Sequence, residues 1–483
     1  MAAENNENGN RKIISGLLWK LLELGGTQGI QLVVSIILAR ILSPEEFGTI
    51  SLITIFITIA NTFVQSGFAT SLVQKKDVYD DDYSSVLWVS LLFAAVMYAV
   101  LFFAAPFIAE YYSVPVLTSL IRVTGIILFP GALVSIQTSY VSRNMQFNKL
   151  FIGSLVSVIV SGAAAIIMAA RGFGVWAMSA QQIVYYFIMM FVMLIIISWK
   201  PKFVIVFSRV KEFFGFGWKI LTAGLIDTIW TNVYGLVIGK RFSTAELGGY
   251  NRGEQFPKLI ATNLGAAVQA VMLPVYSKSQ DNKDDLKSLL QATVKYSSFV
   301  LLPMMAGLAA VARPMISLLL TDKWLFCVPY LQILAVSYAF YPIHTANLQA
   351  INAQGRSDLF LKLEIIKKIS GILFLVIGLR FGIIAMLILK TVNEVICAVI
   401  NSHPNKKLLG YGFISQIKDI LPEIISSAIM YAAVFAVTLS KLNGAILLLI
   451  QIITGIAVYL LMSLLINRKT LKGFKDGIMK IFR

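Results

Sequence analysis

Long runs of hydrophobic residues, separated by short polar loops, extend over almost the whole chain. Many runs reach about 18 residues or more, which is long enough for an α-helix to cross a bilayer. The pattern predicts an all-α polytopic membrane protein with about fourteen transmembrane helices and no soluble domain between them. The predicted spans are 16–42, 48–70, 84–109, 115–141, 149–170, 174–198, 216–240, 246–274, 291–320, 326–353, 359–379, 381–402, 419–440 and 443–466.

The first six and the next six predicted helices repeat one another. SIILARILSPEEFG at residues 35–48 is echoed by LVIGKRFSTAELGG at residues 236–249, and FGVWAM at residue 173 by FGIIAM at residue 381. The aligned pairs include Arg40 with Lys240, Ser43 with Ser243, Glu46 with Glu246, Gly48 with Gly248, Pro115 with Pro329, Pro130 with Pro342, Arg143 with Arg356, and Lys149 with Lys362. Such ordered matches indicate a duplicated unit.

An even number of helices returns the chain to the same side of the membrane, so the two copies have parallel topology. We expect two lobes, formed by residues 1–200 (helices 1–6) and 201–403 (helices 7–12), around a central cleft. Residues 404–483 add helices 13 and 14, which have no counterpart, and a basic cytoplasmic tail.

Polar residues form stripes on four of the apolar helices, in equivalent positions of the two repeats. We expect these stripes to line the hydrated cleft, because polar groups at bilayer depth face protein or water. In the first two helices the stripes contain Lys20, Glu23, Thr27, Gln28, Gln31, Ser35, Thr54, Thr58, Asn61 and Gln65. In the seventh and eighth they contain Lys219, Thr222, Asp227, Thr231, Arg252, Glu254, Gln255, Lys258, Thr262 and Gln269.

Ionisable residues within the spans cost about 2.5–3.5 kcal/mol each on insertion scales, which makes them candidates for function. Asp227 has no basic residue at i±3 or i±4 and is the strongest candidate for ion or proton coupling. Other candidates for coupling are Glu23, Glu254, Lys390 and Glu394. Structural explanations compete: Arg40 and Lys240 can extend to the interface, Arg122 can pair with Glu110, Glu254 with Lys258, and Lys390 with Glu394.

Composition and charge agree with a membrane transporter. Hydrophobic residues make up 58% of the chain and charged residues 13%, while the net charge is +17. Basic residues cluster in alternate loops, which places both termini in the cytoplasm by the positive-inside rule. The chain has two cysteines and two histidines and lacks the G-x-x-x-x-G-K-[ST], G-x-S-x-G, H-E-x-x-H and C-x-x-C motifs. We therefore expect no enzyme, resident metal or cofactor, and the glycines of ELGGTQG suggest close helix packing.

Several stretches resemble the polysaccharide flippases of the multidrug/oligosaccharidyl-lipid/polysaccharide exporter superfamily, and in particular the bacterial O-antigen, exopolysaccharide and teichuronic acid exporters. They are LARILSPEEFG, GFATSLVQKKDVYDDD, SYVSRNMQF, GFGVWAMSAQQ, RPMISLLLTDKW and NAQGRSDL. The resemblance implies a flippase in the bacterial plasma (inner) membrane that moves undecaprenyl-pyrophosphate-linked oligosaccharide from the inner to the outer leaflet by alternating access. It also implies membrane lipids, a polysaccharide polymerase and glycosyltransferases as partners. Nucleic acid is not expected as a partner, because the basic residues lie in short clusters in alternate loops.

The resemblance further implies that cationic cavity residues meet the pyrophosphate. Together with the polar stripes, this gives a candidate substrate site of Lys20, Gln28, Gln31, Arg40, Asn61, Arg122, Arg252 and Lys258. The acidic residues leave a coupling ion, Na⁺ or H⁺, open. Two alternatives also stay open: a cation-coupled multidrug exporter of the same superfamily, and a non-transporting scaffold of a polysaccharide assembly complex.

Overall fold

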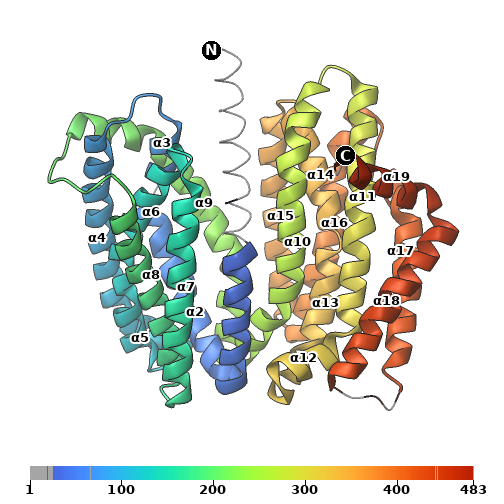
Figure 1. Cartoon of the computed structure of the whole chain (residues 1–483), viewed down its shortest axis with the longest axis horizontal. Coiled ribbons are helices and arrows are strands. Elements are labelled where there is room, and N and C mark those ends of the chain that lie inside the picture. The colour runs from blue at the N-terminus through green and yellow to red at the C-terminus, as the bar shows by residue number, and fades with distance from the viewer. Residues whose placement is uncertain (1–18, 20–24, 66, 441, 443, 482–483) are drawn as a thin grey trace. The chain divides into compact units, whose positions relative to one another are not determined.

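The structure is a computed structural model that describes residues 19, 25–65, 67–440, 442 and 444–481. Within these residues the chain forms helices and no strands, as the hydrophobic pattern predicts (Figure 1). After the helical segment Gly25–Ile41, the α-helices are α2 Pro44–Gln65, α3 Phe68–Gln74, α4 Asp80–Tyr112, α5 Leu117–Thr124, α6 Leu128–Arg143, α7 Phe147–Ala170, α8 Val175–Ile196, α9 Phe207–Arg241, α10 Thr244–Lys278, α11 Lys283–Ala310, α12 Ala312–Leu320, α13 Val328–Tyr338, α14 Tyr341–Ala353, α15 Ser357–Gly378, α16 Ile383–Leu409, α17 Phe413–Val437, α18 Gly444–Ile466 and α19 Arg468–Ile481. The short 3₁₀ helices Gly125–Ile127 and Asp322–Cys327 precede α6 and α13.

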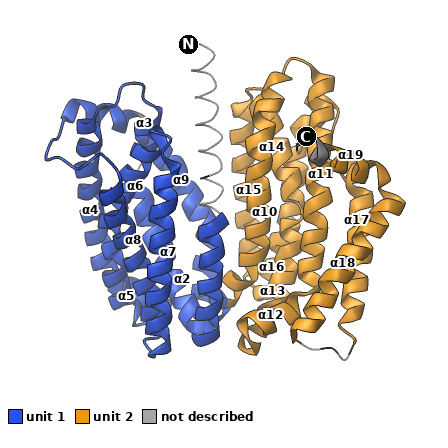
Figure 2. Cartoon of the chain, viewed as in Figure 1, with its two compact units in different colours: residues 1–248 blue, residues 249–483 orange. Residues whose placement is uncertain are grey.

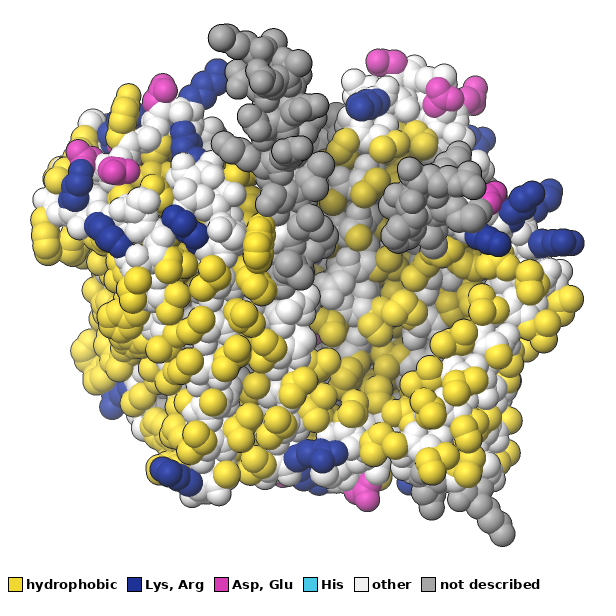
Figure 3. All heavy atoms as spheres, in the orientation of Figure 1, with side chains coloured by type: hydrophobic (Ala, Val, Ile, Leu, Met, Phe, Trp, Pro, Cys, Tyr) yellow, Lys and Arg dark blue, Asp and Glu magenta, His cyan; other side chains and the backbone are white. Residues whose placement is uncertain are grey.

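Twelve helices of the described chain are long and apolar enough to cross a membrane. Two further predicted spans correspond to Gly25–Ile41, which is shorter, and α15, which carries several charged residues. On the face shown in Figure 3, hydrophobic side chains cover the middle of the helices, while charged side chains gather toward their ends. On α4, for example, Phe103 and Phe107 are 70% and 71% exposed, which is compatible with lipid and not with water. The chain is a multi-pass membrane protein.

Helix packing divides the chain into two compact units, Met1–Gly248 and Gly249–Arg483, which we call unit 1 and unit 2 (Figure 2). The division lies within α10, whereas the repeat in the sequence begins its second copy near residue 201. The difference arises because α9, the first helix of the second copy, packs against α2, α3 and α4 of unit 1. The lobe boundaries at residues 200 and 403 concern the duplication and stay predictions.

The structure supports the duplication at the turn that precedes α2 and α10. In both copies the preceding helix ends two residues before a Ser, and the next helix starts directly after that Ser. The Ser43 hydroxyl accepts from the backbone N–H of Glu46, and the Glu46 carboxylate accepts from that of Ser43 at 2.7 Å. In the second copy, the Ser243 hydroxyl accepts from the backbone N–H of Glu246 at 3.1 Å. The repeated S-x-x-E is therefore a helix-capping signal.

Two further correspondences hold, and one alignment changes. Gly174 and Gly382 both have positive φ, 55° and 92°, and each lies directly before a helix, α8 or α16. The interrupted pair α5–α6 corresponds to α13–α14. The predicted match of Arg143 with Arg356 is out of register with this geometry, because Arg143 ends α6 whereas Arg356 follows the turn after α14.

The starts of α2 and α10 touch reciprocally within unit 1. A Cβ atom at Gly48 would lie 1.7 Å from the carbonyl oxygen of Thr244, and one at Gly248 would lie 2.2 Å from that of Pro44. Since residues 44 and 48 are equivalent to 244 and 248, these contacts are exchanged by a local two-fold relation. The ELGGTQG glycines do not make such close contacts: nothing lies within 4 Å of a Cβ at Gly25 or Gly29, and one at Gly26 would lie 3.6 Å from the Phe151 ring.

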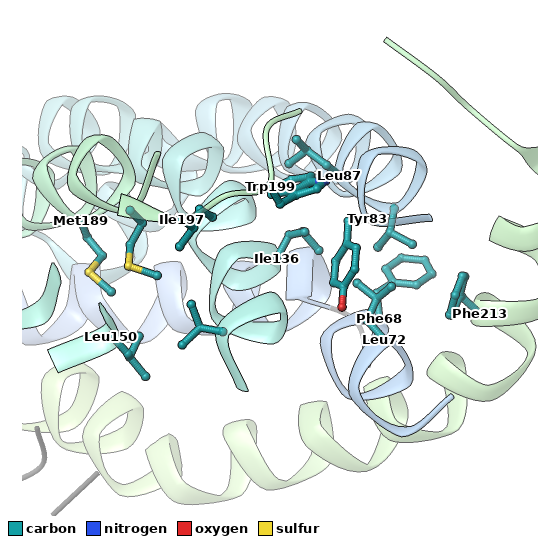
Figure 4. Close-up of a cluster of buried hydrophobic side chains, with 13 residues drawn as sticks. Phe68, Leu72, Tyr83, Leu87, Ile136, Leu150, Met189, Ile197, Trp199 and Phe213 are labelled. Carbon is teal, nitrogen blue, oxygen red and sulfur yellow. The ribbon is translucent and has the colours of Figure 1, made fainter. Parts of the chain in front are cut away.

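Large side chains fill the core of unit 1. Phe68, Tyr83, Trp199 and Phe213, from four different segments, are each at most 2% exposed and belong to one cluster (Figure 4). The indole N–H of Trp199 donates to the backbone carbonyl of Asp80 at the start of α4. The cluster therefore joins α3, the start of α4 and the loop before α9 into one packed end.

A charged cluster in unit 2

A carboxylate from α10 lies at the centre of a polar cluster within unit 2. Glu254 Oε1 is 2.8 Å from the Lys390 Nζ on α16 and accepts hydrogen bonds from Tyr250 at 2.9 Å and Tyr338 at 3.3 Å. Its other oxygen is 3.9 Å from Lys258 Nζ. Glu254 and Lys390 side chains are each 14% exposed, whereas that of Lys258 is 50% exposed. The carboxylate is thus satisfied internally, while Lys258 offers its charge at the surface of unit 2.

A second pair lies one helical turn further along α16. Glu394 Oε2 is 3.3 Å from His344 Nε2 on α14, and Asn401 Nδ2 is 3.0 Å from His344 Nδ1. The Nε2 contact is close enough for a charge pair but is not aligned as a hydrogen bond. Lys367 on α15 pairs with Glu364 at 2.5 Å. With Tyr338 on α13, five helices of unit 2 therefore supply ionisable groups to one region.

Unit 1 has a neutral pair at positions equivalent to Glu254 and Lys390, and a neutral residue at the position equivalent to Glu394. The repeat offset of 200 in α2 and α10 aligns Thr54 with Glu254, and the offset of 208 in α8 and α16 aligns Gln182 with Lys390. Gln182 donates to Thr54 at 3.0 Å, so the neutral contact matches the ion pair. Tyr186, which aligns with Glu394, accepts from Asn61 at 3.4 Å. The Thr54–Gln182 contact and the Glu254–Lys390 ion pair thus join equivalent positions by different chemistry. Asn61 instead aligns with Ala261, and Glu394 contacts His344 on α14.

Lys390 and Glu394 form their ion contacts with residues of other helices and not with each other. These residues share a face of α16 at i, i+4, but Lys390 contacts Glu254 on α10 and Glu394 contacts His344 on α14. For each of these side chains, the oppositely charged group within contact distance lies on a neighbouring helix and not one turn away on α16. The predicted pairing of Glu254 with Lys258 exists at 3.9 Å, and it is secondary to the contact with Lys390.

Arg252 differs from Lys258 in its surroundings, although both were predicted to meet an anionic substrate. Arg252 is 7% exposed, donates to Gln255 Oε1 at 2.5 Å, and lies 5.8 Å from the ring of Trp324. These contacts hold the Arg252 side chain against other residues of unit 2, so it contributes to helix packing. Of these two predicted cations, Lys258 is the one available to a ligand of unit 2.

The cationic candidates of unit 1 contact aromatic rings and carbonyl groups. The Arg122 guanidinium lies 4.2 Å from the ring of Phe102 and donates to the carbonyl of the same residue at 3.2 Å, and this arrangement replaces the predicted pair with Glu110. Lys240 lies over the ring of Tyr111 at 4.3 Å and donates to its carbonyl oxygen. Arg40 is exposed at the end of its helix. These positions fit side chains that extend to an interface.

The remaining candidates of unit 1 are spread along its helices. Asp227 is exposed on α9, Gln31 is exposed, and Gln28 is half-buried on the helix before α2. Asn61 is buried against Tyr186. Lys20 and Glu23 lie outside the described residues. Among the described residues of unit 1, none of these candidates joins a charged cluster like that around Glu254.

Three members of the unit 2 cluster were not predicted from the sequence. Tyr250 lies four residues before Glu254, so helical spacing alone could have indicated it. Tyr338 and His344 come from α13 and α14, and only the fold brings them to Glu254 and Glu394. In the described chain, no group of three or more His, Cys, Asp or Glu residues has an arrangement that could hold a metal ion.

Comparison with known proteins shows which family the chain belongs to. The model of a family described as "Polysaccharide biosynthesis protein" matches residues 37–329, which is more than half of the chain. The chain belongs to this family. The chain is also 24% identical over 474 residues to the succinoglycan biosynthesis transport protein ExoT of Rhizobium meliloti (strain 1021), covering 95% of this chain and 94% of that protein.

Two further proteins resemble the chain over most of its length. It is 25% identical over 469 residues to the teichuronic acid biosynthesis protein TuaB of Bacillus subtilis (strain 168), covering 93% of this chain and 95% of that one. The lipopolysaccharide biosynthesis protein WzxC of Escherichia coli (strain K12) is 22% identical over 400 residues, or 81% of this chain and 79% of that one. The prediction of a non-enzymatic member of a polysaccharide export family is confirmed.

The family member also has the fold of solved transporters. A structure of the lipid II flippase MurJ in an inward closed conformation has a TM-score of 0.76, with 19% identity, over 94% of this chain and 100% of that chain. An inward-facing multidrug resistance MATE transporter gives a TM-score of 0.61 with 13% identity, over 83% of this chain and 95% of that chain. At these identities the similarity establishes the fold, which agrees with the predicted polytopic helical architecture.

Proposed function

We propose that the protein is a flippase that moves undecaprenyl-pyrophosphate-linked oligosaccharide from the inner to the outer leaflet of the bacterial plasma membrane. Similarity to a succinoglycan transport protein over nearly the whole of both chains carries this proposal, and the likeness to a lipid II flippase in fold agrees with it. The product would serve lipopolysaccharide O-antigen, capsule or exopolysaccharide biosynthesis. A polymerase and glycosyltransferases of that pathway would be its partners.

We infer that translocation occurs by alternating access, because MATE transporters of the same fold have been solved in both inward- and outward-facing conformations. With both termini in the cytoplasm, the basic tail would lie at the anionic inner leaflet. Outward movement of an anionic headgroup would gain about 2.3 kcal/mol per charge for each 100 mV of inside-negative potential.

The multidrug-exporter alternative depends mainly on Asp227, a carboxylate exposed on α9. A scaffold would gain no advantage from the buried charges of Glu254 and Lys390, which are costly in a membrane protein. Lys258 supports the flippase instead, because an accessible ammonium group can bind a phosphate oxygen. A coupling ion, Na⁺ or H⁺, belongs to the proposal, but Glu254 is already occupied by its protein partners.

The function is tested by deleting the gene in its native host. Lipid-linked oligosaccharide should accumulate in the inner leaflet, surface polysaccharide should disappear, and expression of the wild-type protein should restore it. Normal surface polysaccharide after deletion, in a strain without a second copy, would refute the assignment. Drug sensitivity with normal polysaccharide would favour the multidrug exporter.

Lys258→Ala is expected to lower transport without unfolding the protein. Removing a charged hydrogen bond to phosphate costs about 1.5–3 kcal/mol, which corresponds to a loss of about tenfold or more in headgroup affinity. Lys362→Ala, which removes an exposed lysine from α15, serves as the matched control. The measurement is surface polysaccharide restored per amount of membrane-inserted protein, and equal restoration by both variants would remove Lys258 from the site.

A further inference from the structure

The duplication allows the charged cluster of unit 2 to be compared with the equivalent positions of unit 1. In unit 1, the contacts between α2 and α8 at Thr54–Gln182 and Asn61–Tyr186 are neutral. In unit 2, the positions on α16 that align with Gln182 and Tyr186 carry Lys390 and Glu394. At the first of these positions a neutral hydrogen bond is therefore sufficient to join the equivalent helices. At the second, Glu394 contacts His344 on α14 and not Ala261, the α10 residue that aligns with Asn61.

Ionised side chains at these positions must be removed from water, which is unfavourable in free energy. Removing ions from water costs several kcal/mol each even after relaxation, and attraction between partners only offsets that cost when the geometry is good. The Glu254–Lys390 contact, at 2.8 Å with two tyrosine donors, meets this condition. The Glu394–His344 contact, at 3.3 Å and poorly aligned, meets it less well. The second pair therefore requires an explanation other than packing.

We propose that His344 and Glu394 form a proton-binding pair, and that protonation of this pair promotes binding of the anionic diphosphate headgroup to unit 2. The inference rests on the proposed function, and it adds the residues that link that function to protons. Histidine is the side chain whose charge ordinarily changes within the physiological pH range. His344 has a carboxylate at one ring nitrogen and an amide at the other.

The surroundings of His344 can hold the imidazole in both of its protonation states. When Asn401 donates its amide N–H to Nδ1, the neutral ring carries its proton on Nε2, toward Glu394. Asn401 Oδ1 is buried and has no hydrogen-bond partner. Rotation of the amide by half a turn would place this oxygen opposite Nδ1, where it could accept a hydrogen bond from the added Nδ1–H. One proton enters from solvent, forms the Nδ1–H bond, and breaks no other bond.

The added proton changes the balance of charge in the cluster. With neutral His344, the carboxylates of Glu254 and Glu394 balance the ammonium groups of Lys258 and Lys390. With protonated His344, one positive charge is in excess, which favours an anion at the half-exposed Lys258. The other titratable or charged groups that face this region are Tyr250 on α10, Tyr338 on α13, Glu364 and Lys367 on α15, and Cys397 on α16.

Farnesyl diphosphate, a soluble isoprenoid diphosphate, provides the probe for a test with the purified full-length protein. Calorimetry in two buffers of different ionisation enthalpy measures how many protons are taken up as the probe binds. Because linkage is reciprocal, the wild type should take up as much as about one proton, and its affinity should rise as pH falls by up to about tenfold per unit. His344→Gln should bind with little proton uptake beyond that of the probe itself.

His403→Gln is the matched control, because it removes the other histidine, which is exposed on α16. It should behave as the wild type does, while the double variant His344→Gln/Glu394→Gln should match His344→Gln. Wild-type proton uptake in His344→Gln, its loss in His403→Gln, or loss of all binding in His344→Gln would each overturn the inference. If binding shows the expected proton linkage but the wild-type protein does not restore surface polysaccharide, the proposed function fails and the proton site stands.

Discussion

Lys390→Ala is expected to destabilise the protein by about 3–5 kcal/mol, because it leaves the carboxylate of Glu254 buried without its cation. The two side chains are only 14% exposed, so water cannot replace the missing ammonium group. Lys258 is at 3.9 Å and half exposed, and it compensates in part. The measurement is the midpoint of thermal unfolding of purified protein in detergent, which should fall clearly relative to wild type.

The double variant Glu254→Gln/Lys390→Gln separates loss of charge from loss of packing. It keeps an acceptor for Tyr250 and Tyr338, and it introduces at position 390 the residue found at the equivalent position 182 of unit 1. Since neutral replacements of buried ion pairs are often nearly neutral in stability, most of the lost stability should return. If the double variant unfolds at the same temperature as Lys390→Ala, the ion pair is not the source of the effect.

The helices and the duplication could be predicted because their signals are local. Apolar length defines a span, Ser43 and Glu46 cap the helix that follows them, and Gly174 and Gly382 mark equivalent helix starts. The packing units could not be predicted, because the sequence repeat does not reveal that α9 packs on α2 and α4. By sequence α9 belongs to the second copy of the repeat, but it packs against helices of the first copy.

The ionisable residues of the candidate site could be predicted from the sequence, but the residues that they contact could not. Glu254, Lys258, Lys390 and Glu394 were recognised because charge in an apolar segment is rare. Their pairing was not, because the i, i+4 rule favours contacts within α16, whereas the fold supplies Glu254 to Lys390 and His344 to Glu394. His344, two residues after Pro342, gave no signal of its partner, because only the fold places α14 beside α16.

Gly48→Ala is expected to disrupt unit 1, with a loss of more than about 3 kcal/mol in stability, since overpacking of even well-tolerated sites costs about 1–3 kcal/mol. The new Cβ would lie 1.7 Å from the Thr244 carbonyl oxygen, a backbone atom that cannot move without shifting the start of α10. Alanine is favoured over glycine in helices by only about 1 kcal/mol, which does not offset such a clash. Lower yield of folded protein and a lower thermal unfolding midpoint would both report the effect.

Gly248→Ala should behave similarly, because its Cβ would lie 2.2 Å from the Pro44 carbonyl oxygen in the reciprocal contact. The double variant should lose less stability than the sum of the losses in the two single variants, because either substitution alone already forces α2 and α10 apart where they cross. Gly29→Ala is the control, because that glycine is helical and nothing lies within 4 Å of its Cβ. An additive double variant would show that the two contacts are independent, and a tolerated Gly48→Ala would show that the helices do not cross at this distance.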